Sequence, residues 1–403
     1  MIYLDWAASA VPYTEEIEAA YREATAVYAN PSAQHRFGKK ARDMLEDARR
    51  RCAAVLKIPA DTLYFTSGAS ESNSLALLSL LTRPNTGSLL ISNIEHPSVR
   101  EQASVLERCG WTVLIVPSDK SGHIAPEAVL ASIREDTVLV SIMSVNNEIG
   151  SVQPIHAIAD ALKAHTAGKR PVHFHVDMVQ AIGKLPVAEL ALNEVHSASM
   201  GAHKIGGPRG IGLLYLKQPL SSAIRGGAQE RSIRPGTENL AGACALARCL
   251  EKTYEDFQRK YERAGELSQF LIDALRQIPE CSLIPASRTS TPKTTASKAA
   301  IPENAASEIA ERKGGCFSPW IIQASFKKLP AEVMLRCLSD RDICISAGSA
   351  CSSKKKIRPI LAALSVSPEV AQNAVRISIG HATTKNELTF FIAAVKEILK
   401  AFD

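Results

Sequence analysis

The chain has 403 residues, a formal net charge of +6, 46% hydrophobic and 22% charged residues, which is the composition of a globular protein long enough for two lobes. The charge is too modest for this length to indicate a direct nucleic-acid partner. No apolar run reaches the roughly 18 residues of a membrane span, and the first residues lack the pattern of a signal peptide, so we expect a cytoplasmic protein with no membrane partner.

Helical and strand-like stretches alternate from about residue 14 to residue 216. Residues 37–56 have helical periodicity, with apolar residues on one stripe. Short apolar or β-rich runs follow, and several are separated by helix-like segments: 62–66, 88–92, 112–116, 137–141 and 172–176. The alternation predicts an α/β fold with a mainly parallel sheet covered by helices.

The composition and the pattern of the chain change after about residue 253. A long charged helix is expected through 262–275, and an amphipathic helix at 385–402. Residues 285–315 are rich in Ser, Thr, Ala, Lys and Pro, which predicts a flexible polar insertion with one or two helical turns at 304–312.

These changes predict two domains. Residues 14–255 form a large cofactor-binding domain, and 256–403 form a small domain that the first residues, 1–13, join.

The chain contains nine cysteines, an odd number, and no C-x-x-C pair. Neither a zinc site nor a disulfide framework is therefore expected, and we predict no bound metal. Most of the cysteines are expected in the core as small hydrophobic residues of a protein in a reducing compartment.

Three residue types in this chain point to pyridoxal phosphate (PLP) chemistry. Lys204 follows His203 in a Gly-rich run, and a lysine amine forms Schiff bases. Asp177 follows a β-rich run, and an aspartate can hold a pyridinium nitrogen protonated. Cys351 lies in a Gly/Ser loop, where a thiol can act as a mobile nucleophile. Together they suggest a sulfur-containing substrate whose sulfur passes to Cys351.

The segment 66–72, Thr-Ser-Gly-Ala-Ser-Glu-Ser, lies between a predicted strand and a predicted helix. Free backbone N–H groups and the helix dipole at such a turn favour a phosphate, and Ser70 adds a hydroxyl. The alternative is a plain N-cap with a Ser/Glu capping pattern.

Further polar residues lie just beyond predicted strands. Asp177 could pair with the ring nitrogen or simply cap the next helix, and Gln180 could donate to the phenolic oxygen of the ring. His96 could stack on the cofactor and shuttle protons, or be structural, and 146–150 could be only a turn. Their joint occurrence favours a site, because the rim of one sheet would gather them.

These motifs resemble the NifS/IscS-type cysteine desulfurases, which are fold-type-I PLP enzymes of aminotransferase class V. The Cys351 loop resembles the longer loop of the NifS/IscS group rather than that of the SufS group. The matching segments cover nearly the whole chain: 3–8, 30–38, 66–72, 95–96, 145–150, 175–180, 203–204, 234–239, the Cys351 loop and 375–380. The resemblance implies an α/β fold-type-I transferase whose large domain has a mostly parallel sheet, with a smaller α+β C-terminal domain.

The resemblance also implies a cofactor-binding set. Lys204 would bind the PLP aldehyde covalently, Asp177 would pair with the pyridine nitrogen, and His96 would stack on the ring. The phosphate and the phenolic oxygen would be held by the remaining members: Ala69, Ser70, Gly201 and His203 at the phosphate, with Asn147 and Gln180 at the phenolic oxygen.

By the same resemblance, Thr237 would reach the phosphate of the neighbouring subunit's cofactor, which implies a homodimer. Arg376 would clamp the carboxylate of L-cysteine, and Asn30 is the other expected substrate-binding residue. Cys351 would take the sulfur as a persulfide, leave alanine, and pass the sulfur to an acceptor protein.

Two positions depart from the family pattern. Gly201 stands where a serine is usual, so one phosphate hydroxyl is missing, at a cost of about 1 kcal/mol of cofactor binding. Asn73-Ser74 replaces the usual Asp-Asn.

Three other functions compete with a cysteine desulfurase. A selenocysteine lyase shares the fold, and a non-catalytic sulfur carrier or scaffold could retain it. An aminotransferase needs no thiol, so Cys351 argues against it. The sequence leaves open whether sulfur goes to iron–sulfur cluster assembly on a scaffold protein or to a tRNA-thiolation enzyme.

Overall fold

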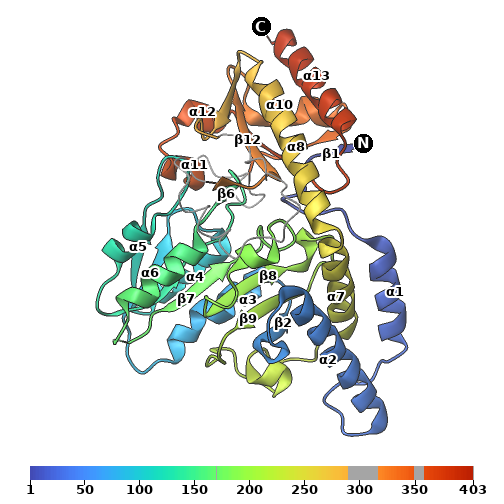
Figure 1. Cartoon of the computed structure of the whole chain (residues 1–403), viewed down its shortest axis with the longest axis vertical. Coiled ribbons are helices and arrows are strands. Elements are labelled where there is room, and N and C mark those ends of the chain that lie inside the picture. Colours follow the sequence, from blue (N-terminus) through green and yellow to red (C-terminus); the bar gives the residue numbers. More distant parts are fainter. Residues whose placement is uncertain (169, 289–315, 349–357, 403) are drawn as a thin grey trace, which may run out of the picture.

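The structure is a computed structural model that describes residues 1–168, 170–288, 316–348 and 358–402. Its helices and strands are arranged in a large lobe and a smaller lobe (Figure 1). The longer helices are α1 Thr14–Thr25, α2 Arg36–Leu56, α3 Ala69–Leu78, α4 Pro97–Arg108, α5 Pro126–Ser132, α6 Ile155–His165, α7 Leu240–Tyr254, α8 Phe257–Arg276, α10 Ala331–Ser339 and α13 Lys385–Ala401. There are also two short helices, α11 Pro359–Ala363, whose Ile360 and Leu361 join the largest apolar cluster, and α12 Pro368–Gln372, which contacts β12.

The large lobe is built on a seven-stranded sheet with strand order β2-β9-β8-β7-β5-β3-β4. Only β9 runs against its neighbours in this sheet, so the sheet is mainly parallel, as the sequence predicts. The strands are β2 Leu63–Thr66, β3 Ser88–Ser92, β4 Thr112–Val116, β5 Thr137–Ser141, β7 His173–Asp177, β8 Ser197–Gly201 and β9 Gly212–Leu216.

Helices cover both faces of this sheet, and the alternation of side chains divides the core accordingly. Helix α3 packs against β7, β8 and β9 on one face. On the other face, Phe174 and Val176 of β7 join the largest apolar cluster together with residues of α2, α6 and α7. Alternate residues of a strand point to opposite faces, so His173, His175 and Asp177 lie on the α3 face.

The smaller lobe has its own antiparallel sheet of three strands, β10 Cys281–Ile284, β12 Ile321–Phe326 and β14 Ala374–Ser378. A separate apolar cluster fills it, with α8, α10 and α13 contributing. The N-terminal strand β1 Ile2–Tyr3 pairs with β13 Ile343–Cys344 in this lobe, although the next helix, α1, packs on α7 of the large lobe (Figure 1). A further two-stranded ladder joins β6 Ser151–Val152 to β11 Cys316–Phe317.

Helix α2 shows how the sequence pattern becomes structure. The imidazole of His35 caps it by accepting from the backbone N–H of Gly38 at 3.0 Å, and Lys57 ends it in the left-handed conformation. The stripe expected from the sequence is buried along its length: Ala41, Leu45, Ala48 and Cys52.

Three elements differ slightly in their bounds from the predictions. Helix α3 begins at Ala69, directly after Gly68, rather than near residue 71. Strand β7 begins one residue later than predicted and includes Asp177. Helix α8 is longer than predicted, since it begins at residue 257. The helical turns predicted at 304–312 lie outside the described residues.

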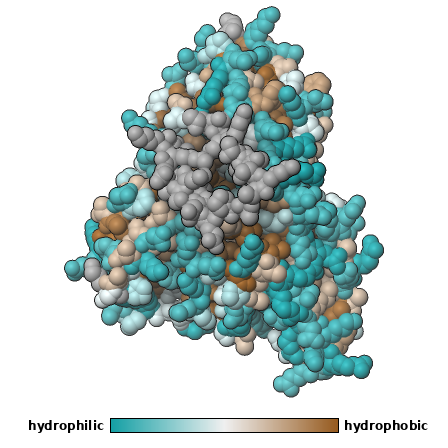
Figure 2. Space-filling model, in the orientation of Figure 1, coloured by the Kyte–Doolittle hydropathy of each residue, from teal (hydrophilic) through white to brown (hydrophobic). Residues whose placement is uncertain are grey.

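The face of the molecule seen in Figure 2 carries mainly hydrophilic side chains, with hydrophobic ones scattered among them. Within the described ranges, no helix combines the length and the apolar character that a membrane crossing requires.

Candidate active site

The polar residues that follow the parallel strands meet at one edge of the large sheet, around a cavity of about 540 Å³. In open α/β sheets this edge, at the carboxyl ends of the strands, is where ligands bind. Nine of the residues singled out in the sequence line the cavity: Ala69, Ser70, His96, Asn147, Asp177, Gln180, His203, Lys204 and Arg376.

Lys204 lies in a short 3-10 helix, Ala202–Lys204, directly after the end of β8. Its Nζ donates to the backbone carbonyls of Ala7 and Ala8, both at 2.8 Å. The N-terminal segment that enters the smaller lobe therefore also forms one wall of the cavity and holds the lysine amine there.

Asp177 ends β7 and is buried. Its Oδ1 accepts from the backbone N–H of Val179 at 3.0 Å, and its Oδ2 accepts from the side-chain amide of Asn73 at 2.9 Å. No helix begins at Asp177 in the structure, so the carboxylate does not act as a helix cap. Both oxygens accept from N–H donors, which hold the carboxylate in a fixed orientation beside the cavity.

His96 occupies the N-cap position of α4. Its Nδ1 accepts from the backbone N–H of Ser98 at 3.1 Å and lies 2.8 Å from the Ser98 hydroxyl. An accepting Nδ1 places the proton of the neutral ring on Nε2. Burial lowers the pKa of His96 below its ordinary value, against the opposing effect of Asp177, so the ring is mainly neutral at pH 7.

Gln180 is held by a second buried lysine. Its Oε1 accepts from Nζ of Lys184, and its Nε2 donates to the carbonyl of Ala7 at 2.9 Å. Burial, followed by the nearby Lys204 and Arg376, lowers the pKa of Lys184 well below its ordinary value. A lysine placed against Oε1 leaves Nε2 as the donor on the cavity side of the amide.

The N-terminus of α3 opens on the cavity through Ala69 and Ser70. Gly68 before it has a φ of 153°, which side-chain-bearing residues rarely adopt. The backbones also approach closely here, because a Cβ on Gly212 would lie 2.7 Å from the Cα of Gly68. Free N–H groups of a first helical turn, with the helix dipole, suit an anion such as a phosphate.

His203 lines the same cavity as the α3 N-terminus. Burial, and then the positive charges of Lys204, Lys184 and Arg209, lower its pKa to about 4. The ring is neutral at pH 7 and can offer a phosphate a single N–H.

Arg376, in the middle of β14, reaches the cavity from the smaller lobe. One terminal nitrogen donates to the Asn147 carbonyl at 2.8 Å and the other to Oδ1 of Asp5 at 2.9 Å. Its Nε is buried with no hydrogen-bond partner among the described residues. The guanidinium group lines the cavity, where a planar cation suits a carboxylate ligand.

The structure does not bring every predicted site residue to this cavity. Asn30 and Thr237 lie together at a separate cavity of about 240 Å³. Gly201 ends β8 and is not part of the cavity lining, although the site residues His203 and Ala69 are its neighbours. Cys351 lies outside the described residues, as does most of the polar stretch 285–315.

Sequence reasoning gave no role to several residues at or beside the cavity, and three of these bear on the site. Arg209 lines it, Asn73 bonds Asp177, and Lys184 bonds Gln180. Arg209 lies within the Gly-rich run after Lys204, which was a usable signal. Asn73 and Lys184 lie on the far side of other site residues, so only contacts in space reveal them.

These residues fit pyridoxal phosphate. A lysine amine and a buried carboxylate line a cavity of about 540 Å³, a volume typical of cofactor sites. A helix N-terminus suits the phosphate, and the guanidinium group of Arg376 on the same cavity suits an amino-acid carboxylate. Lys204, Asp177, His96 and the first turn of α3 are the groups that would hold the cofactor.

Comparison with known proteins points in the same direction. The family model described as aminotransferase class-V matches residues 2–314. A NifS/IcsS protein homolog of Lactobacillus delbrueckii is 34% identical over 407 residues, covering 100% of this chain and 98% of that protein. The cysteine desulfurase IscS of Dictyoglomus turgidum is 31% identical, covering 99% and 94%. A solved structure of a NifS-like protein covers 99% of both chains with a TM-score of 0.83 and 28% identity.

Proposed function

The chain belongs to the aminotransferase class-V family, and from this premise we propose that it is a PLP-dependent cysteine desulfurase. The observation that carries the proposal is the convergence of an amine, a carboxylate and an imidazole on one cavity: Lys204, Asp177 and His96. Relatives named cysteine desulfurase align over nearly the full chain, which supports the same activity here.

The proposed reaction moves sulfur from L-cysteine to the thiol of Cys351. The carbon–sulfur bond of cysteine breaks, a sulfur–sulfur bond forms at Cys351, and hydrogen replaces sulfur on the carbon that becomes the methyl group of alanine. Atoms and electrons balance between cysteine plus thiol and alanine plus persulfide, so no outside oxidant or reductant is required.

Bound PLP would supply an aldehyde that captures amines and a ring that withdraws electrons from the adjoining bonds. Asp177 holds its carboxylate towards the cavity and would keep the ring nitrogen protonated. His96 holds its proton on Nε2, from which it can donate to the substrate. Arg376 would orient the substrate carboxylate through its guanidinium group.

The decisive experiment is incubation of the purified protein with PLP, L-cysteine and dithiothreitol. We expect sulfide and alanine in equal amounts, because the dithiol reduces the persulfide and regenerates the Cys351 thiol. Lys204→Ala is the matched control and is expected to release neither product. Alanine without sulfide, or no turnover by protein that has bound PLP, would contradict the proposal.

We also propose that the active unit is a homodimer. Thr237 lies at a cavity separate from that of Lys204, so a role at a cofactor phosphate requires a second copy of the chain. Co-expressed Lys204→Ala and Thr237→Ala chains should form mixed dimers with one intact site. We expect these dimers to bind PLP more tightly than Thr237→Ala alone, whereas equal affinities would argue against shared sites.

The persulfide sulfur would pass to an acceptor protein, either a scaffold for iron–sulfur clusters or a tRNA-thiolation enzyme, in the cytoplasm. A persulfide is a transferable form of sulfur, which supports a carrier role. Cysteine labelled with radioactive sulfur, added to cell extract with the enzyme, would show whether label enters clusters or tRNA. Label that stays in free sulfide only would argue against a dedicated acceptor.

A further inference from the structure

A continuous chain of hydrogen bonds runs along the α3 face of the large sheet. It begins at His173 Nε2, which lies 2.8 Å from Ser197 Oγ, and the same hydroxyl lies 2.8 Å from His175 Nδ1. Nε2 of His175 lies 2.9 Å from Asn73 Oδ1, and the Asn73 amide donates to Asp177 at 2.9 Å. The chain joins the amino-terminal end of β7 to the carboxylate at its carboxyl end.

The direction of every bond in this chain follows from its last member. Both carboxylate oxygens of Asp177 accept, so the Asn73 amide points its NH₂ group at Oδ2 and turns its own Oδ1 towards His175. His175 must then carry its proton on Nε2 and accept at Nδ1 from the Ser197 hydroxyl. The remaining lone pairs of Ser197 face His173, which donates from Nε2.

Burial excludes the alternative in which a ring donates from both nitrogens. His175, Ser197 and Asn73 are each fully buried. Burial lowers the pKa of His175 to about 3 and that of His173 to about 4, so both rings are neutral and each carries one N–H at pH 7. If the tautomer of His175 changed, Asn73 would turn its oxygen towards the Asp177 carboxylate, and two acceptors would face each other.

The same amide also reaches the catalytic imidazole. Nδ2 of Asn73 donates to Ser98 Oγ at 2.8 Å, and that hydroxyl lies 2.8 Å from His96 Nδ1. A Ser98 hydroxyl that accepts from Asn73 has its own proton available for His96 Nδ1. One amide therefore orients both Asp177 and His96.

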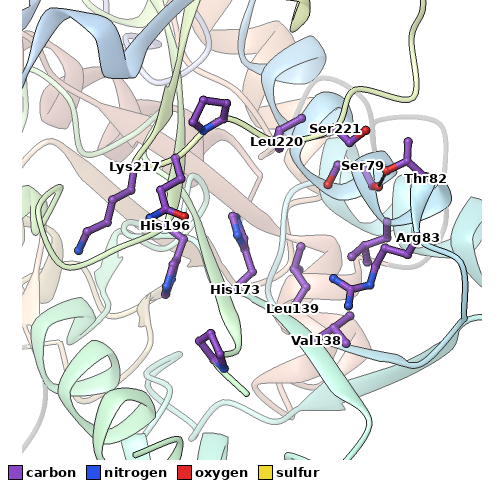
Figure 3. Close-up of a pocket in the computed structure, with 14 residues that line it drawn as sticks. Ser79, Thr82, Arg83, Val138, Leu139, His173, His196, Lys217, Leu220 and Ser221 are labelled. Carbon is purple, nitrogen blue, oxygen red and sulfur yellow. Dashed lines mark hydrogen bonds between the residues drawn. The ribbon is translucent and has the colours of Figure 1, made fainter. Parts of the chain in front are cut away.

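The hydrogen-bond chain ends at His173, which lines another cavity, of about 460 Å³. Figure 3 shows the rings of His173 and His196 close together there, between Lys217 on one side and Arg83 on the other. The two ring centroids are 5.3 Å apart. The chain of hydrogen bonds thus extends along the α3 face, from a cavity at the amino-terminal end of β7 to the proposed cofactor site at its carboxyl-terminal end.

We propose that Asn73 is a positioning residue for both Asp177 and His96, and that His175, whose Nδ1 is held by Ser197, anchors the oxygen of its amide. The inference rests on the proposed cofactor site but not on the identity of the substrate. Asn73 does not line the cavity. It acts through the carboxylate of Asp177 and the imidazole of His96, which do. Ser197, one strand away, is the least disruptive place to test it.

The first test uses PLP-free protein labelled with ¹⁵N-histidine. Imidazole ¹⁵N shifts report which nitrogen carries the proton. We expect wild type to show His175 and His96 as Nε2–H tautomers, and Asn73→Leu to convert His175 into a mixture of tautomers, because no amide oxygen then selects Nε2–H. Ser141→Ala is the matched control, since Ser141 is fully buried on the neighbouring strand, opposite His175, and its hydroxyl has no partner among the described residues. It should leave both rings unchanged.

The second test measures the dissociation constant of PLP. Ser197→Ala should weaken binding by about three- to tenfold, the worth of one hydrogen bond, whereas Ser197→Thr, which keeps the hydroxyl, and Ser141→Ala should bind as wild type does. Asn73→Leu, which removes the amide outright, should weaken binding by roughly tenfold or more.

Wild-type tautomers and wild-type PLP affinity in Asn73→Leu would overturn the inference. Equal weakening by Ser197→Ala and Ser141→Ala would also overturn it, because general loss of packing would then explain both. If wild type itself binds no PLP, the proposed function fails, while the tautomer measurement still decides whether the chain of hydrogen bonds is directional.

Discussion

Gly201 is a single residue at which the structure sharpens an expectation from the sequence. Its backbone is in an ordinary extended conformation, with φ of −125°. A Cβ there would lie 3.6 Å from Ala69 Cβ and 3.6 Å from His203 Cε1, which are normal contacts. A serine would therefore fit without strain beside residues expected at the phosphate.

We predict that Gly201→Ser tightens PLP binding. The added hydroxyl would contribute about 1 kcal/mol, or roughly a fivefold lower dissociation constant, if it reaches the phosphate. Fluorescence titration of the PLP-free protein measures this. Gly201→Ala adds the Cβ without the hydroxyl and should bind no more tightly than wild type; if it gains as much as the serine variant, the hydroxyl is not the cause.

Cys351 is the residue on which the sulfur chemistry depends. We predict that Cys351→Ser abolishes sulfide release from L-cysteine while PLP binding is retained. A hydroxyl cannot accept sulfane sulfur, whereas the cofactor-binding groups lie on other elements. Sulfide formation and the visible absorption of bound PLP are measured on the same sample. Near-normal sulfide release would mean that another thiol accepts the sulfur.

At the scale of an element, a buried ion pair ties α2 to the segment that leads to Thr237. Arg49 donates to both carboxylate oxygens of Glu230, at 2.7 and 2.8 Å, and to the carbonyl of Leu63 at 2.8 Å. Glu230 also accepts from the backbone N–H of Phe65 at 2.7 Å. Both charged side chains are almost completely buried, so each depends on the other.

We predict that Arg49→Met lowers the free energy of unfolding by about 3–5 kcal/mol, because it leaves the carboxylate of Glu230 buried and unpaired. Urea unfolding of the PLP-free protein measures the change. The double variant Arg49→Met, Glu230→Met should recover much of the loss, since no buried charge remains and Glu46, the other partner of Arg49, is half-exposed. A double variant as unstable as the sum of both single variants would indicate that packing, not charge, sets the cost.

At the scale of the whole molecule, buried titratable groups set the pH of greatest stability. Burial lowers the pKa of His173 to about 4, of His175 to about 3 and of His203 to about 4, from an ordinary 6.5. Their contribution to the free energy of unfolding is complete above pH 6.5 and is lost as the pH falls towards 4 and 3. Glu95 has the opposite effect. Burial raises its pKa to about 8, so its contribution to the free energy of unfolding is lost as the pH rises from 4.5 through 8.

We therefore predict opposite contributions to the unfolding free energy of the PLP-free protein between pH 6.5 and 8. The lowered pKa of the buried Lys184 makes its contribution rise with pH, whereas the raised pKa of Glu95 makes its contribution fall, by about 2 kcal/mol. Glu95→Gln keeps the oxygen that accepts from Ser92 and Met143 but does not ionise. Urea unfolding of wild type and Glu95→Gln across this range should therefore show the variant gaining stability relative to wild type by about 2 kcal/mol. A difference between the two proteins that does not change with pH would show that Glu95 is not the cause.

The sequence alone predicted several elements and nine of the twenty residues that line the cavity. Strands β3, β4 and β5 have the predicted bounds, because short apolar runs between turn signals are a local property. Asp177 and His96 were found because each follows a predicted strand, and the carboxyl ends of parallel strands meet at one edge. Lys204 was found from its residue type in a Gly-rich run. Residue type and place in the chain were sufficient for these assignments.

Only the tertiary structure decided which polar groups bond one another and which cavity each residue faces. Asn73 meets His175 and Asp177 across the interface between α3 and β7, at a separation in sequence that no periodicity reveals. Asn30 and Thr237 share a cavity apart from Lys204 for the same reason. Local patterns determine whether a side chain faces the core or the rim, but the direction of a buried hydrogen bond depends on every partner that packing brings within reach.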